Sequence, residues 1–187
     1  IAYSRGLALL GSCSTIFFVG RHEPRKGLSV LLGAMNELPS DIRLWIASDG
    51  PETEELKERF AGDPRIEWLG RISEKEKFSR MKGADIFCAP SLRGESFGIV
   101  LLEGMACDTV VVASDIPGYS KVAEEGKHAV LVPPDDSYSL AIAIEKILGD
   151  ESRQEEIREN GRKRASQFSM KSLAKRYLDS YQELLKA

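Results

Sequence analysis

Cysteine and histidine are scarce in this chain, and the few present form no disulfide or metal-binding pattern. The three cysteines, Cys13, Cys88 and Cys107, are scattered without paired spacing, which argues against a disulfide framework and against zinc. This usage fits a reducing cytoplasm, where thiols stay free. We expect Cys88 and Cys107 to be small core residues rather than nucleophiles. The sequence contains no Asp-x-Asp pair and no histidine–carboxylate cluster with ligand spacing, so we predict no metal site.

An excess of charge and long apolar runs are also missing. The 26 lysines and arginines nearly balance the 29 aspartates and glutamates, for a net charge of −3. Bulk electrostatics therefore give no reason to expect nucleic acid as a partner. No apolar run is long enough to span a bilayer. The first twenty residues are rather apolar, but Arg5 interrupts them and no convincing cleavage site follows, so we do not predict a signal peptide.

Two glycine-rich fingerprints of nucleotide-binding proteins are absent as well. The order Gly-x-x-x-x-Gly-Lys-Ser/Thr does not occur, which argues against a P-loop. No Gly-x-Gly-x-x-Gly follows any candidate strand, so a nicotinamide dinucleotide domain of the dehydrogenase type is poorly supported.

What the sequence does contain is a regular alternation of short apolar runs with helix-like segments. The predicted strands are Thr15–Val19, Ile42–Ala47, Ile66–Leu69, Ile86–Ala89, Val110–Ala113 and Ala129–Val132. The predicted helices are Leu28–Asn36, Glu52–Phe60, one that begins at Ser73 with Glu76 completing a capping box, Ile99–Ala106, Tyr119–Glu125, Ser137–Leu148, Glu151–Gln167 and Ser169–Lys186. Continuous rather than alternating apolar strands are typical of sheets covered on both faces. The pattern therefore predicts an α/β fold: a Rossmann-like, doubly wound, six-stranded parallel sheet with C-terminal helices.

The segment from Glu95 to Glu103 is the most informative one for function. It follows the fourth predicted strand and places one carboxylate before a helix and a second within it, at the edge where parallel α/β sheets bind ligands. Two such acids suit a hydroxyl-rich partner such as a sugar or ribose. Gly98 near the helix start allows a ligand to approach the backbone, and the free N–H groups there favour a diphosphate. Ser96 as the helix N-cap, using one of those donors, is the structural alternative.

Charged and glycine-containing loops follow the other predicted strands. These loops are Gly20–Gly27, Asp49-Gly50, Gly70-Arg71, Arg93–Glu95 and Asp115–Gly118, and all lie at carboxyl ends of strands. In the first of them, Arg21 and Lys26 are suited to grip a diphosphate, since Arg binds phosphate oxygens in pairs and Lys adds a compact charge. A merely solvated loop is the alternative. His22 lies in the same loop, but adjacency alone does not make it catalytic.

Taken in order, these pieces resemble the C-terminal, donor-binding domain of retaining GT-B glycosyltransferases. The matching pieces are Gly20-Arg21, Arg25–Gly27, Asp49-Gly50, Trp68–Gly70, Ala84-Asp85, Glu95–Glu103, Gly104–Ala106, Val111–Asp115 and Gly118. The resemblance spans residues 15–185. Within the family, Glu23–Gly27, Cys88–Pro90 and Gly94–Leu101 look most like the phosphatidylinositol mannosyltransferases, which use GDP-mannose.

The resemblance implies a role for each matching site residue. It makes Arg21, Lys26 and Glu95 the catalytic residues: the two cations hold the donor diphosphate, and Glu95 contacts the sugar hydroxyls. Glu103 is expected to accept hydrogen bonds from the ribose. The remaining donor-binding residues implied are Gly20, Arg71, Ile72, Ser96, Phe97, Gly98 and Ile99, of which Arg71 and Ile72 border the base.

The implied reaction is transfer of a sugar from a nucleoside diphosphate with retention of anomeric configuration, without a metal or other cofactor. Because the chain does not begin with Met, we expect residues 1–187 to be the nucleotide-sugar-binding domain of a longer protein whose N-terminal, acceptor-binding domain is absent. The expected acceptor is a membrane lipid of the phosphatidylinositol type. The full-length protein would then be cytoplasmic and peripheral at the inner membrane face, and this domain alone would bind nucleotide weakly without transferring sugar.

Three other functions remain open on sequence grounds. One is a transferase that uses a UDP-sugar, or a nucleotide-sugar epimerase on the same fold. Another is a non-catalytic nucleotide-sugar-binding module that keeps Arg21 and Lys26 but needs no acceptor domain. The third, a dehydrogenase-type cofactor domain, is disfavoured by the missing glycine fingerprint.

Overall fold

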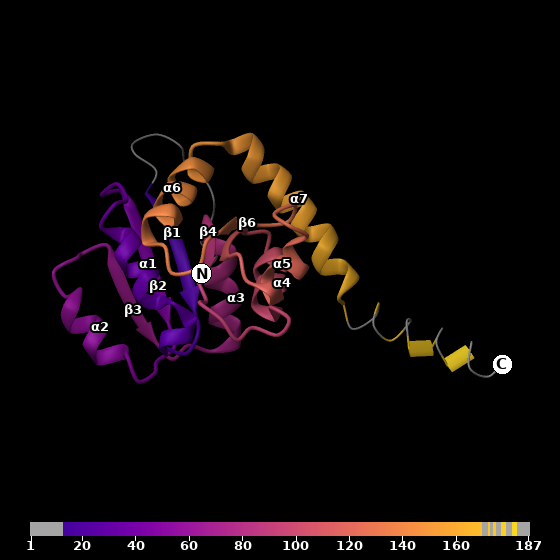
Figure 1. The fold of residues 1–187 in the computed structure, drawn as a ribbon, viewed down its shortest axis with the longest axis horizontal. Coiled ribbons are helices and arrows are strands. Elements are labelled where there is room, and N and C mark those ends of the chain that lie inside the picture. The colour runs from indigo at the N-terminus through magenta and orange to yellow at the C-terminus, as the bar shows by residue number, and fades with distance from the viewer. Residues whose placement is uncertain (1–12, 170–171, 173, 175–176, 179–180, 183–187) are drawn as a thin grey trace.

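A computed structural model describes residues 13–169, 172, 174, 177–178 and 181–182 of the chain. Its centre is a six-stranded sheet in the order β3-β2-β1-β4-β5-β6, in which all neighbours pair in parallel (Figure 1). The strands are β1 (Ser14–Val19), β2 (Ile42–Ala47), β3 (Ile66–Gly70), β4 (Ile86–Ala89), β5 (Val110–Ser114) and β6 (Val130–Val132). The predicted α/β, doubly wound, six-stranded parallel sheet is confirmed.

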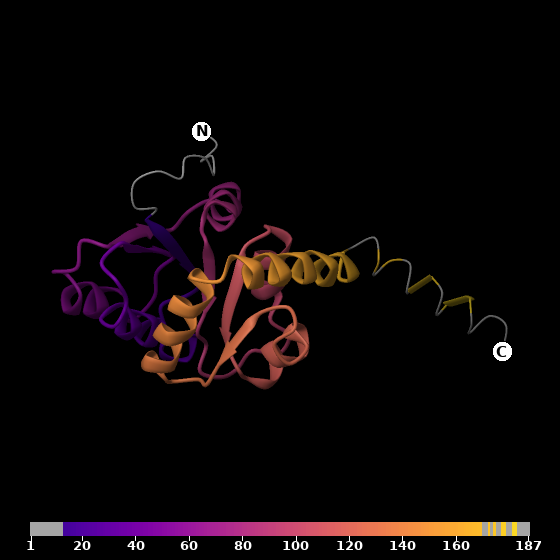
Figure 2. The same cartoon turned by 90° about the horizontal axis from the view of Figure 1, so that it is seen from above.

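The helices follow the strands in the order expected from the sequence. They are α1 (Leu28–Met35), α2 (Thr53–Arg59), α3 (Glu74–Gly83), α4 (Ile99–Ala106), α5 (Pro117–Ala123), α6 (Ser137–Leu148) and α7 (Glu151–Gln167), with a short 3-10 turn, η1 (Pro24–Lys26), before α1. After β6 the chain continues through α6 into α7, which packs against α4 (Figure 2). Ser73 caps α3 as predicted, because its hydroxyl accepts a hydrogen bond from the Glu76 N–H at 3.2 Å.

Most predicted ends agree with the structure to within one residue. The exception is the helix predicted over Tyr119–Glu125, which begins at Pro117 and ends at Ala123. Proline favours the first turn of a helix, and Glu124 adopts a left-handed φ of 45° that stops it. The predicted helix Ser169–Lys186 falls partly outside the described residues.

Apolar side chains fill both faces of the sheet, in two separate clusters. Along β1, Ile16 and Phe18 join the cluster with α1 and α6, whereas Phe17 joins the cluster with α3, α4 and α5. Alternate residues of one continuous apolar strand are therefore buried on opposite faces, as the sequence pattern predicts. Cys88 is a fully buried core residue, and burial raises the pKa of its thiol. No helix in the described part of the chain is long and apolar enough to cross a membrane.

The packing of α4 onto the sheet leaves no space for a side chain at Gly104. A Cβ atom there would lie 2.9 Å from the Phe87 ring and 3.0 Å from Val111 Cγ2. We predict that Gly104→Ala lowers the free energy of unfolding by about 1–2 kcal/mol, because overpacking of about 1–3 kcal/mol exceeds the gain in helix propensity of up to about 1 kcal/mol. Urea denaturation measures this change.

The matched control is Gly62→Ala, because a Cβ atom at Gly62 would meet no atom within 4 Å. This variant should stay within about 0.5 kcal/mol of the native chain. Equal stability of the Gly104 and Gly62 variants would contradict the close approach of α4 to β4 and β5.

Candidate functional site

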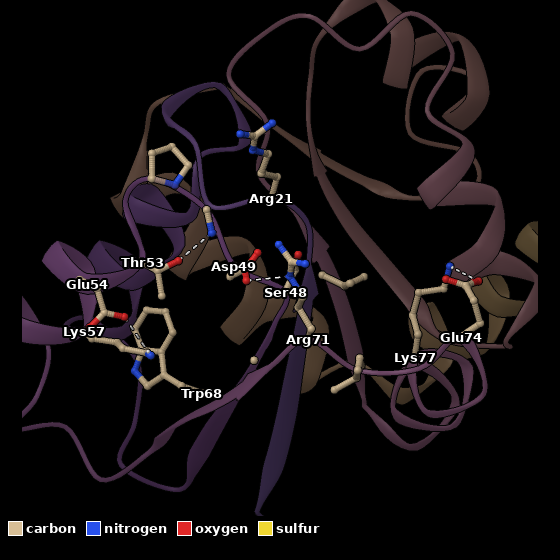
Figure 3. A pocket seen from close by; sticks show the side chains of 15 residues that line it. Arg21, Ser48, Asp49, Thr53, Glu54, Lys57, Trp68, Arg71, Glu74 and Lys77 are labelled. Carbon is tan, nitrogen blue, oxygen red and sulfur yellow. Dashed lines mark hydrogen bonds and ion pairs between the residues drawn. The ribbon is translucent and has the colours of Figure 1, made fainter.

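A cavity of about 1170 Å³ opens where β1, β2 and β3 end. Its lining residues are Val19, Arg21, Ser48–Pro51, Thr53, Glu54, Lys57, Trp68, Gly70–Ile72, Glu74 and Lys77. They come from the ends of β1 and β3, from three loops and from α2 and α3, and Figure 3 shows their side chains. The carboxyl edge of a parallel sheet is the usual ligand site of such folds, and residues at that edge of β1 and β3 line the cavity.

Charged side chains from neighbouring loops meet at the mouth of this cavity. Arg71 Nε donates to Asp49 Oδ2 at 2.8 Å (Figure 3). This hydrogen bond lowers the pKa of Asp49 and raises the pKa of Arg71. Arg21 lines the same cavity, is 71% exposed and contacts Glu23 at 4.0 Å. Its guanidinium is therefore accessible to an anionic ligand.

A second charged group lies where the loops after β1 and β4 touch. A Cβ atom on Gly27 would fall 2.0 Å from the Pro90 carbonyl oxygen, so only glycine permits this approach, and its φ of 66° suits glycine as well. The contact brings Lys26 Nζ to 2.5 Å from Glu95 Oε1. The strand order reverses between β1 and β4, because the chain runs from β1 to β3 on one side and from β4 to β6 on the other. Sheets of this kind bind ligands at this topological switch point.

Bridging side chains connect these two charged groups. Glu23 pairs with Arg25 at 2.7 Å and with Arg21 at 4.0 Å, while Arg25 reaches Glu95 Oε1 at 3.4 Å. Arg21 at the cavity is thereby linked to Glu95 in the loop after β4. A diphosphate lying across this line would meet two or three cations.

Glu103, on α4, is not among the residues that line the cavity, but it contacts one of them. Its Oε1 accepts a hydrogen bond from Lys77 Nζ at 3.1 Å, and Lys77 itself lines the cavity. Burial opposes the charge on Lys77, but hydrogen bonds to Glu74 and Glu103 outweigh burial and raise its pKa. Sequence analysis missed Lys77, because a lysine on a charged helix resembles a solvated surface residue.

The loop before α4 differs from the sequence-based expectation in one respect. Gly98, with a φ of 78°, is the N-cap, and no side-chain hydrogen bond caps α4 in the described structure. The alternative that Ser96 is the N-cap is therefore wrong. The first N–H groups of α4 have no side-chain partner at this end, which leaves them available for an anion.

The side chains of Phe97 and Ile99 lie away from the main cavity. They line a separate apolar groove of about 810 Å³ between α3, α4 and the end of α7. Phe97 packs edge-on against Phe168 with ring centroids 5.4 Å apart, and Ile99 is 65% exposed. Neither side chain lines the main cavity, so the donor contacts expected of this segment fall to its backbone.

Three of the predicted site residues line the main cavity, and most of the others lie in the loops and helix beside it. Arg21, Arg71 and Ile72 line the cavity, and the Gly20 N–H bonds to Ala47 at the end of β2. Lys26 and Glu95 pair in the adjoining loops, with Ser96 and Gly98 directly after Glu95, and Glu103 adjoins the cavity through Lys77.

Ser48 is a further cavity residue that the sequence did not reveal. Its φ is 88°, a conformation that is strained for a residue with a side chain. Gly70, on the adjacent strand, also has a positive φ, which glycine adopts without strain. The Ser48 N–H donates to the Gly70 carbonyl at 2.7 Å and joins the ends of β2 and β3. Nothing in the sequence pattern signals this backbone conformation.

His22 is a buried support beneath the cavity. It is 1% exposed, its Nδ1 lies 2.8 Å from Thr53 Oγ1, and its ring meets Trp68 edge-on. A Cβ atom on Gly50 would fall 2.4 Å from the His22 carbonyl oxygen. His22 therefore fixes the loop after β1 against the loop after β2, and burial lowers its pKa.

The fold defines a class of protein. The six-stranded parallel sheet of Rossmann type is shared with solved GT-B glycosyltransferases. Sucrose-phosphate synthase from Thermosynechococcus elongatus superimposes with a TM-score of 0.82 at 28% identity, over 95% of this chain and 47% of that one. The Anabaena protein HepE, solved with UDP and glucose, gives a TM-score of 0.81 at 24% identity over 91% of this chain and 48% of that one, which supports the fold alone.

The sequence comparisons give the family. The profile of the family described as "Glycosyl transferases group 1" matches residues 9–164, and the chain belongs to that family. The phosphatidyl-myo-inositol mannosyltransferase of Mycolicibacterium smegmatis is 45% identical over 143 residues, 73% of this chain and 36% of the relative. That of Mycobacterium leprae is 38% identical over 173 residues, 90% of this chain and 46% of the relative. The chain therefore spans less than half the length of these relatives.

The buried state of His22 predicts a dependence of stability on pH. Burial holds its folded-state pKa below the ordinary value of 6.5, so below that pH the unfolded chain takes up a proton that the folded chain excludes. Stability contributed by neutral His22 is present above pH 6.5 and is lost as the pH falls. We predict that the thermal midpoint falls more between pH 7.5 and 5.5 in the native chain than in His22→Gln. Parallel profiles for the two proteins would contradict a buried, neutral His22.

Proposed function

We propose that this chain is the donor-binding domain of a retaining glycosyltransferase and that it binds a nucleoside-diphosphate sugar. The observation that carries the proposal is a set of ion pairs beside the main cavity: Arg21 and Lys77 line it, Lys77 pairs with Glu103, and Lys26 pairs with Glu95 in the adjoining loops. These residues come from loops and helices far apart in sequence. Membership in the group 1 family adds the chemical class of the reaction.

The charges suit each part of such a donor. Arg21 is an exposed guanidinium and Lys26 a compact ammonium, and together they match the two phosphates of a diphosphate. The uncapped start of α4 adds backbone N–H donors on the same side. Glu103, held by Lys77, accepts hydrogen bonds from ribose hydroxyls, and Glu95 accepts them from the sugar.

In the proposed reaction the anomeric carbon loses its bond to the diphosphate oxygen and gains one to the acceptor hydroxyl on the same face. The acceptor proton passes to an oxygen of the departing phosphate. Glu95 is engaged by Lys26 at 2.5 Å and acts as a binding residue rather than a nucleophile. The main contribution of the protein is stabilisation of negative charge on the leaving diphosphate by Arg21, Lys26 and helix N–H groups. We propose no metal in this role.

The proposed donor is GDP-mannose and the proposed acceptor is a phosphatidylinositol-type lipid. Support comes from the identity of 45% to a phosphatidyl-myo-inositol mannosyltransferase. The acceptor site would lie on an N-terminal domain of the longer protein, which would be cytoplasmic and peripheral at the inner membrane face. The domain alone would bind donor without transferring sugar. A UDP-sugar donor, an epimerase and a non-catalytic module remain as outcomes of the test.

We predict that Lys26→Ala weakens GDP binding by about tenfold or more, because the loss of a charged hydrogen bond to a phosphate has that effect. Isothermal titration calorimetry of the chain with GDP, UDP and ADP, and with GDP-mannose and UDP-glucose, measures both the affinity and the donor preference. A preference for UDP over GDP would replace the donor in the proposal.

The control is Lys163→Ala on α7, which removes the same charge from an exposed residue paired with Glu159. It should leave the affinity for GDP unchanged. Unchanged GDP affinity in Lys26→Ala would remove Lys26 from the site, and a native chain that binds none of the nucleotides would overturn the proposed function.

A further inference from the structure

The start of α5 packs directly beneath the loop that carries Glu95. A Cβ atom on Gly118 would fall 1.9 Å from the Glu95 carbonyl oxygen, and one on Gly98 would fall 2.8 Å from the Tyr119 ring. The backbone of this loop therefore has no space to move toward α5. Tyr119 itself is 1% exposed and lies in the apolar cluster formed with α4.

A chain of hydroxyl groups connects Tyr119 to the Glu95 carboxylate. Tyr119 Oη lies 3.0 Å from Ser91 Oγ, and Ser91 Oγ donates to Glu95 Oε1 at 3.3 Å. A carboxylate only accepts hydrogen bonds, so the Ser91 proton points to Glu95 and the Tyr119 O–H must donate to Ser91. Burial raises the pKa of Tyr119, which keeps its phenol protonated and able to donate.

All hydrogen bonds and ion pairs of the Glu95 side chain within the described structure fall on one carboxylate oxygen. Oε1 accepts from Lys26 at 2.5 Å, from Ser91 at 3.3 Å and from Arg25 at 3.4 Å, and Oε2 has no partner among the described residues. The side chain is 13% exposed. Oε2 is thus the atom available to accept a hydrogen bond from a ligand.

The donors to Oε1 differ in what a bound diphosphate does to them. Lys26 and Arg25 are cations on the loop after β1, and a doubly charged ligand competes with Glu95 for them. Ser91 and Tyr119 are neutral and nearly fully buried, so an anion does not draw them away. Ser91, which Tyr119 holds in turn, is therefore the donor that stays on Oε1 when the cations bind a phosphate.

We propose that Ser91 and Tyr119 form a buried relay that keeps Oε2 of Glu95 aimed at the donor sugar when Lys26 engages the diphosphate. Tyr119 is a positioning residue in this account, because it acts on the ligand only through Ser91 and Glu95. The inference rests on the proposed function, in which Glu95 binds a sugar hydroxyl.

The test separates the sugar contact from the nucleotide contact. Affinities for GDP and for GDP-mannose are measured by calorimetry for the native chain, for Tyr119→Phe and for Ser91→Ala. Tyr119→Phe removes one oxygen and keeps the buried ring. We expect the ratio of GDP-mannose to GDP affinity to fall by about fivefold in each variant, as expected for a single lost hydrogen bond, with GDP affinity unchanged. The control is Tyr138→Phe on α6, an exposed phenol that should leave both affinities unchanged.

The outcomes distinguish the relay from a merely structural role of Tyr119 and from failure of the proposed function. An unchanged ratio in Tyr119→Phe, or an equal loss of affinity for both ligands, would overturn the relay, since the second result is what a merely structural role gives. Ser91→Ala supplies the same answer if Tyr119→Phe does not fold, as judged by its thermal midpoint. A native chain that binds no nucleotide would instead overturn the proposed function.

Discussion

The close contact between the loops after β1 and β4 is the constraint on which the rest of the site depends. Gly27 lies against the Pro90 carbonyl so tightly that no side chain fits between them. This contact exists because β1 and β4 are neighbours in the sheet although two strands separate them in sequence. It places Lys26 beside Glu95, and any larger residue at position 27 would separate the cation from the carboxylate.

Most charged side chains around the site form ion pairs with one another. Asp49 pairs with Arg71 and Glu103 with Lys77, while Lys26 pairs with Glu95. These ion pairs within the chain neutralise most of the charged groups that are proposed to bind the donor. A nucleoside diphosphate would exchange these partners rather than meet bare charges, which limits the desolvation cost of keeping the site ready. The neutral hydroxyls beneath Glu95 are the part of the network that this exchange leaves in place.

The sequence predicted the sheet well because its signal is local. Six continuous apolar runs and the Ser73 cap depend only on neighbouring residues, and the structure has them within about one residue of the predicted ends. What the sequence did not reveal depends on strand order and backbone conformation. The Ser91–Tyr119 contact joins the loop after β4 to α5, 28 residues along the chain. The left-handed φ at Gly98 makes that residue the N-cap of α4, instead of the alternative Ser96. Lys77 pairs with Glu103 because α3 lies beside α4 in the fold, a neighbourhood that the sequence does not predict.

The most direct test of the central claim is an NMR titration of the ¹⁵N-labelled chain with GDP. If one cavity at the carboxyl edge of the sheet binds the nucleotide, amide shifts will cluster at residues 20–27, 48–50, 70–72 and 95–99. Residues around the groove beside β6, which includes Val130 and Lys146, will stay unperturbed. Shifts centred on that groove, or none at saturating nucleotide, would contradict the account.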